Sequence, residues 1–272
     1  MFQKEEFLFA ADDVQAAIHK LAHAEKVTVL TGAGISVASG IMPFRGRGGL
    51  WEKYDPEEAA NIESFTRDPR SSWVMLKEIL QVVAKAEPNA GHHSLARLED
   101  LGVVNTIITQ NVDGLHQEAG SKNVIEFHGN TRRVICMACR GQYATVSIRL
   151  KVLPPYCPIC GGVLKPDVVF FGEAIPKAAL LQSHVETTEC QVMLVVGTSG
   201  MVDPAASLPA VARTKGALVI EVNPSRSHLT STATDVFLEG RSELVLPMLV
   251  DEVETALGIG KSSSDMRKKN AE

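Results

Sequence analysis

Short apolar segments recur along the chain, and each is followed by a group of small or polar residues. The segment 27–30 runs into TGAGIS at 31–36, and the segment 191–196 runs into GTS at 197–199. Segments with helical periodicity separate them, so the alternation predicts an α/β fold with an open parallel sheet. Such a sheet binds ligands at the carboxyl ends of its strands, where these small and polar groups would gather. The other predicted strands are 103–109, 124–127, 168–171, 217–222 and 235–238.

The connecting segments differ in character. Residues 40–56 are rich in glycine and contain two prolines, which predicts a loop without regular structure. The apolar Leu50 and Trp51 in this segment favour a functional loop over a disordered one. Helices are predicted at 12–23, 71–86, 91–101 and 243–257, and in segments that begin near 176 and 204.

Four of the five cysteines form two C-x2-C pairs, Cys136 with Cys139 and Cys157 with Cys160. This spacing predicts a zinc ribbon, because two such pairs complete a tetrahedron of thiolates around Zn²⁺. Sulfur takes all four positions, so the metal would be structural and would have no open site for catalysis. The fifth cysteine, Cys190, precedes an apolar run and is predicted to be a small buried residue.

Composition narrows the range of partners. The 272 residues carry a net charge of −5, which leaves no basic surface for sequence-specific nucleic-acid binding. A basic peptide would suit this charge better. No apolar run approaches the roughly 18 residues of a membrane span, and the first residues do not resemble a secretory signal. We therefore expect a cytoplasmic protein without membrane association, and we favour a monomer.

Polar residues at the predicted strand ends are candidates for binding or catalysis, but they do not identify a reaction. The GAG at 32–34 offers backbone amides to a phosphate, although Val37 stands where a G-x-G-x-x-G fingerprint needs glycine. His128 follows a strand and is a candidate general base, or a structural histidine. Asn111 and Asp113 suit recognition of an amide group, or simple turn capping.

The motifs together closely resemble the sirtuin family of NAD-dependent protein deacylases, in the prokaryotic type with a structural zinc ribbon. The resemblance covers residues 12 to 257 in order. The matching motifs, beside the four cysteines, are GAGIS at 32–36, GIMPFRG at 40–46, QNVDGLH at 110–116, FHG at 127–129, KPDVVFFGE at 165–173, GTS at 197–199 and VNPS at 222–225.

This resemblance implies a Rossmann-like large domain and a smaller domain built from two insertions. The large domain would comprise 1–47, 93–131 and 166–258. The smaller domain would combine a helical segment, 48–92, with the zinc ribbon, 132–165, and 259–272 would be a flexible tail. NAD and an acyl-lysine peptide would enter the cleft between the domains from opposite sides.

The resemblance also implies roles for individual residues. His128 and Asn111 would be catalytic, with His128 as general base on the ribose hydroxyls, and Asp113 would accept from the nicotinamide carboxamide. The residues expected to bind NAD are Gly32, Ala33, Gly34, Ser36, Phe44, Arg45, Gln110, Asn111, Asp113, Gly197, Thr198, Ser199, Asn223 and Pro224. Those expected to bind the acyl-lysine substrate are Val169, Phe171, Gly172, Glu173, Leu76 and Ile79.

Two departures from the family pattern bear on activity. Pro43 stands where many members carry Asp or Thr, which removes a polar side chain beside nicotinamide. Members that remove succinyl or malonyl groups carry a tyrosine and an arginine where this chain has Leu76 and Ile79. We therefore expect acetyl or longer apolar acyl groups to be preferred, with nicotinamide, 2′-O-acyl-ADP-ribose and free lysine as products. The alternatives are a protein ADP-ribosyltransferase, an NAD hydrolase or a non-enzymatic NAD sensor or adaptor.

Overall fold

The computed structural model describes residues 11–43 and 49–259. Its larger sheet has six strands, all parallel, in the order β3-β2-β1-β7-β8-β9. The strands β4 to β6 lie in a separate sheet. When the six strands of the larger sheet are numbered on their own, their order is 3-2-1-4-5-6, which is the order of dinucleotide-binding sheets. The six strands are β1 Val27–Thr31, β2 Thr106–Thr109, β3 Val124–Glu126, β7 Val192–Val196, β8 Leu218–Asn223 and β9 Val236–Glu239.

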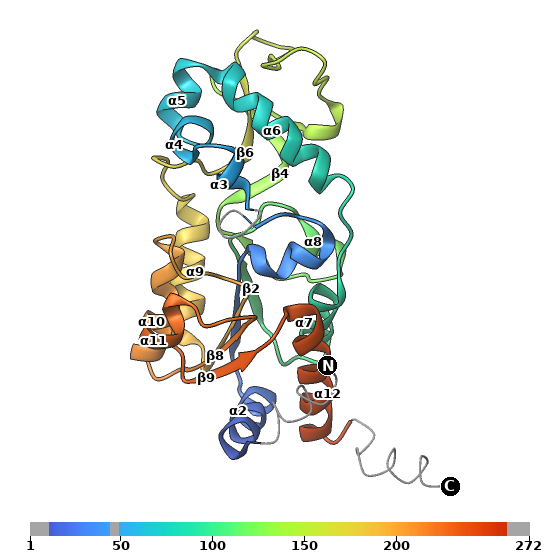
Figure 1. Cartoon of the computed structure of the whole chain (residues 1–272), viewed down its shortest axis with the longest axis vertical. Coiled ribbons are helices and arrows are strands. Elements are labelled where there is room, and N and C mark those ends of the chain that lie inside the picture. Colours follow the sequence, from blue (N-terminus) through green and yellow to red (C-terminus); the bar gives the residue numbers. More distant parts are fainter. Residues whose placement is uncertain (1–10, 44–48, 260–272) are drawn as a thin grey trace, which may run out of the picture.

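Helices cover both faces of this sheet (Figure 1). On one face α2, α7 and α12 pack over strand residues such as Val29 and Leu194. On the other face α9, α10 and α11 cover the alternate residues, such as Met193 and Val195. All residues of β1 and β7 are buried, as expected for parallel strands covered on both sides. The six helices are α2 Asp12–His23, α7 Ala90–Asp100, α9 Lys177–Glu189, α10 Leu208–Thr214, α11 His228–Thr232 and α12 Ser242–Ala256.

A second core lies above the carboxyl edge of the large sheet in Figure 1. It joins the antiparallel sheet β5-β4-β6 to four helices, and we call this group the small-sheet module. Trp73 is fully buried at its centre, where its indole Nε1–H donates to the carbonyl oxygen of Leu164 at 2.8 Å. Its elements are α3 Leu50–Lys53, α4 Pro56–Ala59, α5 Ile62–Arg67, α6 Pro69–Val83, β4 Gly129–Cys136, β5 Gln142–Ala144 and β6 Leu164–Val168.

Two of the predicted elements are wrong. The strand predicted at 168–171 is not part of the parallel sheet, because β6 ends at Val168 and pairs with β4 as an edge strand, a position that tolerates Pro166. The loop predicted at 40–56 contains the helix α3 and the start of α4. Leu50 is buried in the second core, which stabilises a helix that the glycines alone argue against.

Short elements were also missing from the prediction. They are the 3-10 helices η1 Ala33–Ser39 and η2 Thr145–Ser147, and the helices α4, α5, α11 and α8 Leu115–Glu118, while the helix predicted from near 204 begins as the 3-10 helix η3 Ala205–Ser207. Residues 260–272 of the predicted tail lie outside the described residues, and the two-domain boundaries stay a prediction. Among the residues described, no helix is long and apolar enough to cross a membrane.

The Trp73 hydrogen bond gives a stability test. Trp73→Phe keeps an aromatic ring but leaves the Leu164 carbonyl oxygen without this donor, so the free energy of unfolding should fall by about 1–3 kcal/mol. Val74→Ala, on the same helix and half-exposed, should change it by less than about 0.5 kcal/mol. Urea unfolding of both variants in zinc-containing buffer measures the difference. Equal stabilities for the two variants would contradict a structural role for this bond.

Candidate active site

A cavity of about 640 Å³ lies at the carboxyl edge of the larger sheet, between that edge and the small-sheet module. The loops after β1, β2, β7 and β8 line it from below, together with His128 after β3. Segment 168–173 and helix α6 line it from the module. The predicted residues that line it are Gly32, Ala33, Gly34, Gln110, Asn111, His128, Gly197, Thr198, Ser199, Asn223, Pro224, Val169, Phe171, Gly172, Glu173, Leu76 and Ile79.

The cavity opens at the switch point between β1 and β7, where neighbouring strands continue into loops that diverge. The two loops touch through their glycines. The Gly34 amide donates to the Gly197 carbonyl oxygen at 2.8 Å, and a Cβ on Gly34 would lie 2.6 Å from the Gly197 Cα. Val37, the departure from the fingerprint, is 43% exposed, so a side chain is accommodated there without a close contact.

Hydrogen bonds tie the loops after β2, β7 and β8 to one another. The Gln110 amide donates to the Thr198 hydroxyl at 3.0 Å, and the Asn223 amide donates to the Thr198 carbonyl at 2.9 Å. Asn223 also donates to Glu221, a fully buried carboxylate within β8. Glu221 accepts three further hydrogen bonds, which come from the hydroxyl groups of Ser227, Thr230 and Thr234.

His128 lies in the two-residue link between β3 of the large sheet and β4 of the small sheet. Its Nδ1 lies 3.1 Å from the Gln110 carbonyl oxygen, which can only accept, so Nδ1 carries the proton and Nε2 is the basic atom. Burial lowers the pKa of His128, and the hydrogen bond to Gln110 opposes that shift. The ring is therefore neutral at pH 7, as a general base requires. The His128 carbonyl accepts from the Val169 amide at 2.9 Å.

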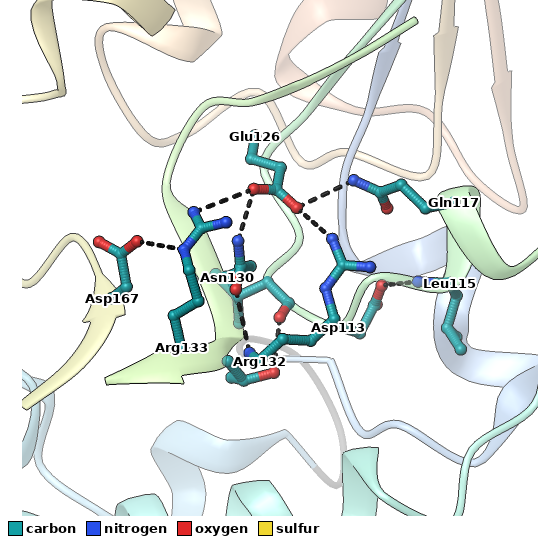
Figure 2. Close-up of polar contacts among 10 residues, drawn as sticks. Asp113, Leu115, Gln117, Glu126, Asn130, Arg132, Arg133 and Asp167 are labelled. Atoms are coloured by element: carbon teal, nitrogen blue, oxygen red, sulfur yellow. Dashed lines mark hydrogen bonds and ion pairs between the residues drawn. The ribbon is translucent and has the colours of Figure 1, made fainter. Parts of the chain in front are cut away.

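A network around Glu126 braces this link (Figure 2). The Glu126 carboxylate, at the end of β3, is bonded by Arg132 at 2.6 Å and by Asn130, both on β4. It also accepts from Gln117 on α8 at 2.9 Å. Arg133 joins it at 3.6 Å and reaches Asp167 on β6 at 2.9 Å. These contacts join both sheets around His128.

A smaller cavity of about 80 Å³ adjoins the first and contains the predicted amide-reading residues. Its polar lining residues are Ser36, Asn111, Asp113 and Glu78, and its apolar ones include Ile41, Met42, Leu50, Val82 and Val83. The Ser36 hydroxyl donates to the Asp113 carboxylate at 2.7 Å. Burial raises the pKa of Asp113, and the hydrogen bonds from Leu115 and Ser36 oppose that rise.

Glu173 has a role in the fold that its sequence does not reveal. Its carboxylate pairs with Lys165 at 2.9 Å and accepts from the Phe170 amide at 2.8 Å. Lys165 is almost fully buried, and it also donates to the Val168 carbonyl at 2.6 Å and lies over the Phe170 ring. Burial lowers the pKa of Lys165, and the pairing with Glu173 opposes that shift. Glu173 therefore stabilises the bend of segment 168–173.

The four predicted zinc ligands come together at the far end of the small-sheet module. All four sulfur atoms lie within 4.8 Å of one another. The Cys136 and Cys160 sulfurs are 3.5 Å apart, and those of Cys139 and Cys157 are 3.8 Å apart. A tetrahedron with Zn–S bonds of about 2.3 Å has edges of about 3.8 Å, so the cluster fits Zn²⁺. The Tyr143 hydroxyl lies 3.0 Å from the Cys157 sulfur and suits a donor to its thiolate.

Most predicted site residues therefore lie in the two adjoining cavities, while Phe44 and Arg45 lie outside the described residues. The prediction missed Trp51, Met75 and Arg226, which line the larger cavity, and Glu221, which braces the loop after β8. Glu221 had a signal, because an acidic residue interrupts an otherwise apolar strand. Trp51 favoured a functional loop without indicating which cavity it lines, and Met75 had no signal, since its helical spacing also fits an ordinary packed core.

The fold and the site define a dinucleotide-binding α/β protein with an attached zinc ribbon. Residues 32–204 match the model of the Sir2 family. The chain is 48% identical over 237 residues to NAD-dependent protein deacylase 2 of Pyrobaculum aerophilum, covering 87% of this chain and 94% of that protein. The chain belongs to the Sir2 family, the sirtuins of the resemblance above.

Solved structures agree with this assignment. A Sir2 homologue in complex with NAD is 41% identical, with a TM-score of 0.84 over 89% of this chain and 94% of that one. Sir2Af2 bound to a myristoylated histone peptide is 35% identical, with a TM-score of 0.74 over 91% of this chain and 98% of that one. The predicted fold class is confirmed by these likenesses.

The cysteine cluster predicts one zinc ion per chain. Cys139→Ser replaces an exposed ligand, so loss of the metal rather than of packing should lower the free energy of unfolding, by roughly 3 kcal/mol or more. Cys190→Ser, whose buried sulfur donates to the Thr187 carbonyl, should retain the zinc. Elemental analysis with thermal unfolding tests both variants. Full zinc content in Cys139→Ser would refute the assignment of this ligand.

Proposed function

We propose that this chain is an NAD-dependent protein-lysine deacylase in which His128 is the general base. The observation that carries the proposal is the position of His128. Its ring, with the basic Nε2, lines the larger cavity beside segment 168–173. Membership of the Sir2 family and the deacylase activity named for the Pyrobaculum relative support it. NAD is the co-substrate, and the zinc ion is structural.

NAD is proposed to lie along the carboxyl edge of the larger sheet. The glycine contact between the loops after β1 and β7 would let the phosphates approach the backbone of these loops, and Asn223 and Pro224 adjoin the adenosine half. The nicotinamide ring enters the smaller cavity, where Asp113 accepts from its carboxamide. The NAD complex of a Sir2 homologue supports this arrangement. Phe44 and Arg45 are proposed to close over the cofactor.

The reaction is proposed to proceed in two stages. The acyl oxygen of the lysine substrate attacks the ribose C1′ as nicotinamide departs, and close positioning makes this weak nucleophile effective. His128 Nε2 then removes the proton of a ribose hydroxyl, and the 2′-oxygen attacks the acyl carbon. Water completes the release of free lysine and 2′-O-acyl-ADP-ribose. Asn111, on the cavity wall, positions the reacting ribose.

An acyl-lysine peptide is proposed to bind along segment 168–173, with its acyl group in the apolar end of the cavity. Leu76, Ile79, Phe171 and Trp51 line that end, and the Trp51 and Phe171 rings lie 6.2 Å apart. No arginine lies between Arg70 and Arg97, so an acidic acyl group would lack a bidentate partner there. The myristoylated peptide bound by Sir2Af2 supports a preference for apolar acyl groups.

We also propose that the enzyme is cytoplasmic and monomeric and acts on proteins rather than on nucleic acid. The geometry of its four zinc-binding cysteines requires reduced thiols, which suits a reducing compartment. The net charge of −5 favours a basic peptide substrate.

The role of His128 predicts a pH profile. Only the neutral ring accepts a proton, so activity falls as pH drops through the pKa of His128. Because burial lowers that pKa, the acid limb of kcat/KM should have its midpoint below 6.5. His128→Ala should lose at least about 100-fold in turnover, whereas His184→Ala, exposed on α9, should keep both rate and profile. A midpoint above pH 6.5 would contradict this assignment.

The acyl end of the cavity predicts substrate choice. Mass spectrometry of one lysine peptide in acetyl, decanoyl and succinyl forms should show kcat/KM for succinyl at least about tenfold below the others. Leu76→Tyr with Ile79→Arg should raise succinyl turnover by about tenfold, because an arginine then faces the acid. Val74→Arg adds the same charge to an exposed position of α6 and should not do so.

Faster removal of succinyl than of acetyl by the unmodified protein would reject the preference. Nicotinamide release from NAD with every acyl group left in place would instead indicate ADP-ribosyl transfer or NAD hydrolysis.

A further inference from the structure

Arg226 lies in the loop after β8, where it lines the larger cavity beside Asn223 and Pro224. Its guanidinium carbon lies 5.3 Å from the centroid of the Phe237 ring on β9, within the range of a cation–π contact. Within residues 11–43 and 49–259, no hydrogen bond or ion pair holds this guanidinium. Arg241, which follows β9, is by contrast paired with Glu243 at 2.5 Å. The N–H donors of Arg226 are therefore available to an anion in the cavity.

The backbone that carries Arg226 is fixed on both sides. Pro224 restricts the chain two residues before it. Directly after it, the Ser227 hydroxyl donates to the buried Glu221 carboxylate at 2.5 Å and accepts from the Leu229 amide at 3.0 Å. A loop held in this way loses little conformational freedom when its side chain binds a ligand.

Asn223, at the start of the same loop, has the opposite hydrogen-bonding character. Both hydrogens of its side-chain amide are taken, by the Thr198 carbonyl at 2.9 Å and by Glu221 at 2.8 Å. Its Oδ1 can only accept, so it suits a ribose hydroxyl group and would repel a phosphate oxygen. This end of the cavity therefore offers an acceptor for a hydroxyl group and, three residues further on, donors for an anion.

The loop after β8 presents no carboxylate to the cavity among the residues described. The acidic residues that line the larger cavity are Glu173 and Asp203, and neither belongs to this loop. Glu221, within β8, accepts four hydrogen bonds from the protein itself, and Glu239 on β9 does not line the cavity. Dinucleotide sites that select NAD place a carboxylate on the 2′-hydroxyl of the adenosine ribose, whereas an arginine accommodates the 2′-phosphate of NADP. The side chains present here match the second case.

We infer that the adenosine end of the cavity accepts a phosphate on the 2′-hydroxyl of the adenosine ribose, and that Arg226 binds this phosphate. NADP then occupies the same cavity as NAD, with its ribose 3′-hydroxyl bonded to Asn223. The guanidinium, already seated on Phe237, meets the phosphate with two parallel N–H donors. This inference rests on the proposed function, since it assumes that the adenosine half of the dinucleotide adjoins Asn223.

Substitutions of Arg226 separate its charge from its packing. Arg226→Met keeps an unbranched side chain against Phe237 but removes the donors and the charge. Arg226→Glu supplies the carboxylate that NAD-selective sites use. Arg149→Met is the matched control, because Arg149 is exposed on the small-sheet module, lines neither cavity and carries the same charge.

Isothermal titration of the zinc-loaded full chain measures Kd for ADP-ribose and for ADP-ribose 2′-phosphate. The readout is the ratio of the second Kd to the first, which in the unmodified protein should be no greater than about three. In Arg226→Met this ratio should rise at least about tenfold, because charge-assisted hydrogen bonds to the phosphate are lost. In Arg226→Glu it should rise about 100-fold or more, because the carboxylate repels the phosphate. Arg149→Met should keep the ratio of the unmodified protein.

A larger ratio in the unmodified protein would overturn the inference. So would a ratio that stays unchanged in Arg226→Met, or one that rises equally in Arg149→Met, because that pattern indicates net charge alone. Nicotinamide release from NAD, measured on the same samples, separates this inference from the proposed function. The expected ratios in a protein that releases no nicotinamide would support the phosphate site and reject the proposed function, whereas full activity with NAD and a large ratio would do the opposite.

Discussion

The parallel pairing of β1 with β7 is the constraint on which the site depends. These two strands are neighbours in the sheet but far apart in the sequence, and their following loops diverge around a crevice. The loops still touch, through the glycine backbones at Gly34 and Gly197. Side chains at those positions would force the strand ends apart. The cavity therefore depends on the order of the strands and on glycine at these two positions, independently of the polar residues that line it.

Two buried carboxylates, those of Glu221 and Asp113, brace the loops around the cavity through hydrogen bonds from neutral donors. Glu221 is fully buried and accepts four hydrogen bonds from an amide and three hydroxyl groups. Asp113, nearly as buried, accepts from Ser36 and from the Leu115 amide. A buried carboxylate held by several donors has a fixed direction, which suits the recognition of ribose and amide groups. Lys165 and Glu173 provide the contrasting case, an ion pair that bends a loop.

The sequence allowed the parallel sheet, its ligand-binding edge and the zinc ligands to be predicted, because these depend on local periodicity and short spacings. It could not exclude a parallel strand at 168–171, since the apolar run VVFF fits such a strand as well as the irregular segment that Lys165 and Glu173 stabilise. It also could not indicate that the side chain of His92 lies against the Ser36 hydroxyl, 56 positions away in the sequence. Contacts between distant loops therefore decided what local patterns left open.

His128, the proposed base, stands where the two sheets join, and this position ties it to segment 168–173. The link of Phe127 and His128 connects β3 to β4, and Gly129, with φ of 75°, turns the chain there. A Cβ on Gly129 would overlap the Asp167 carbonyl oxygen, so β6 packs directly on the turn. Val169, one residue past β6, donates to the His128 carbonyl. A shift of the small sheet would therefore move segment 168–173 and His128 together, which would preserve the spacing between the proposed peptide-binding segment and the proposed base.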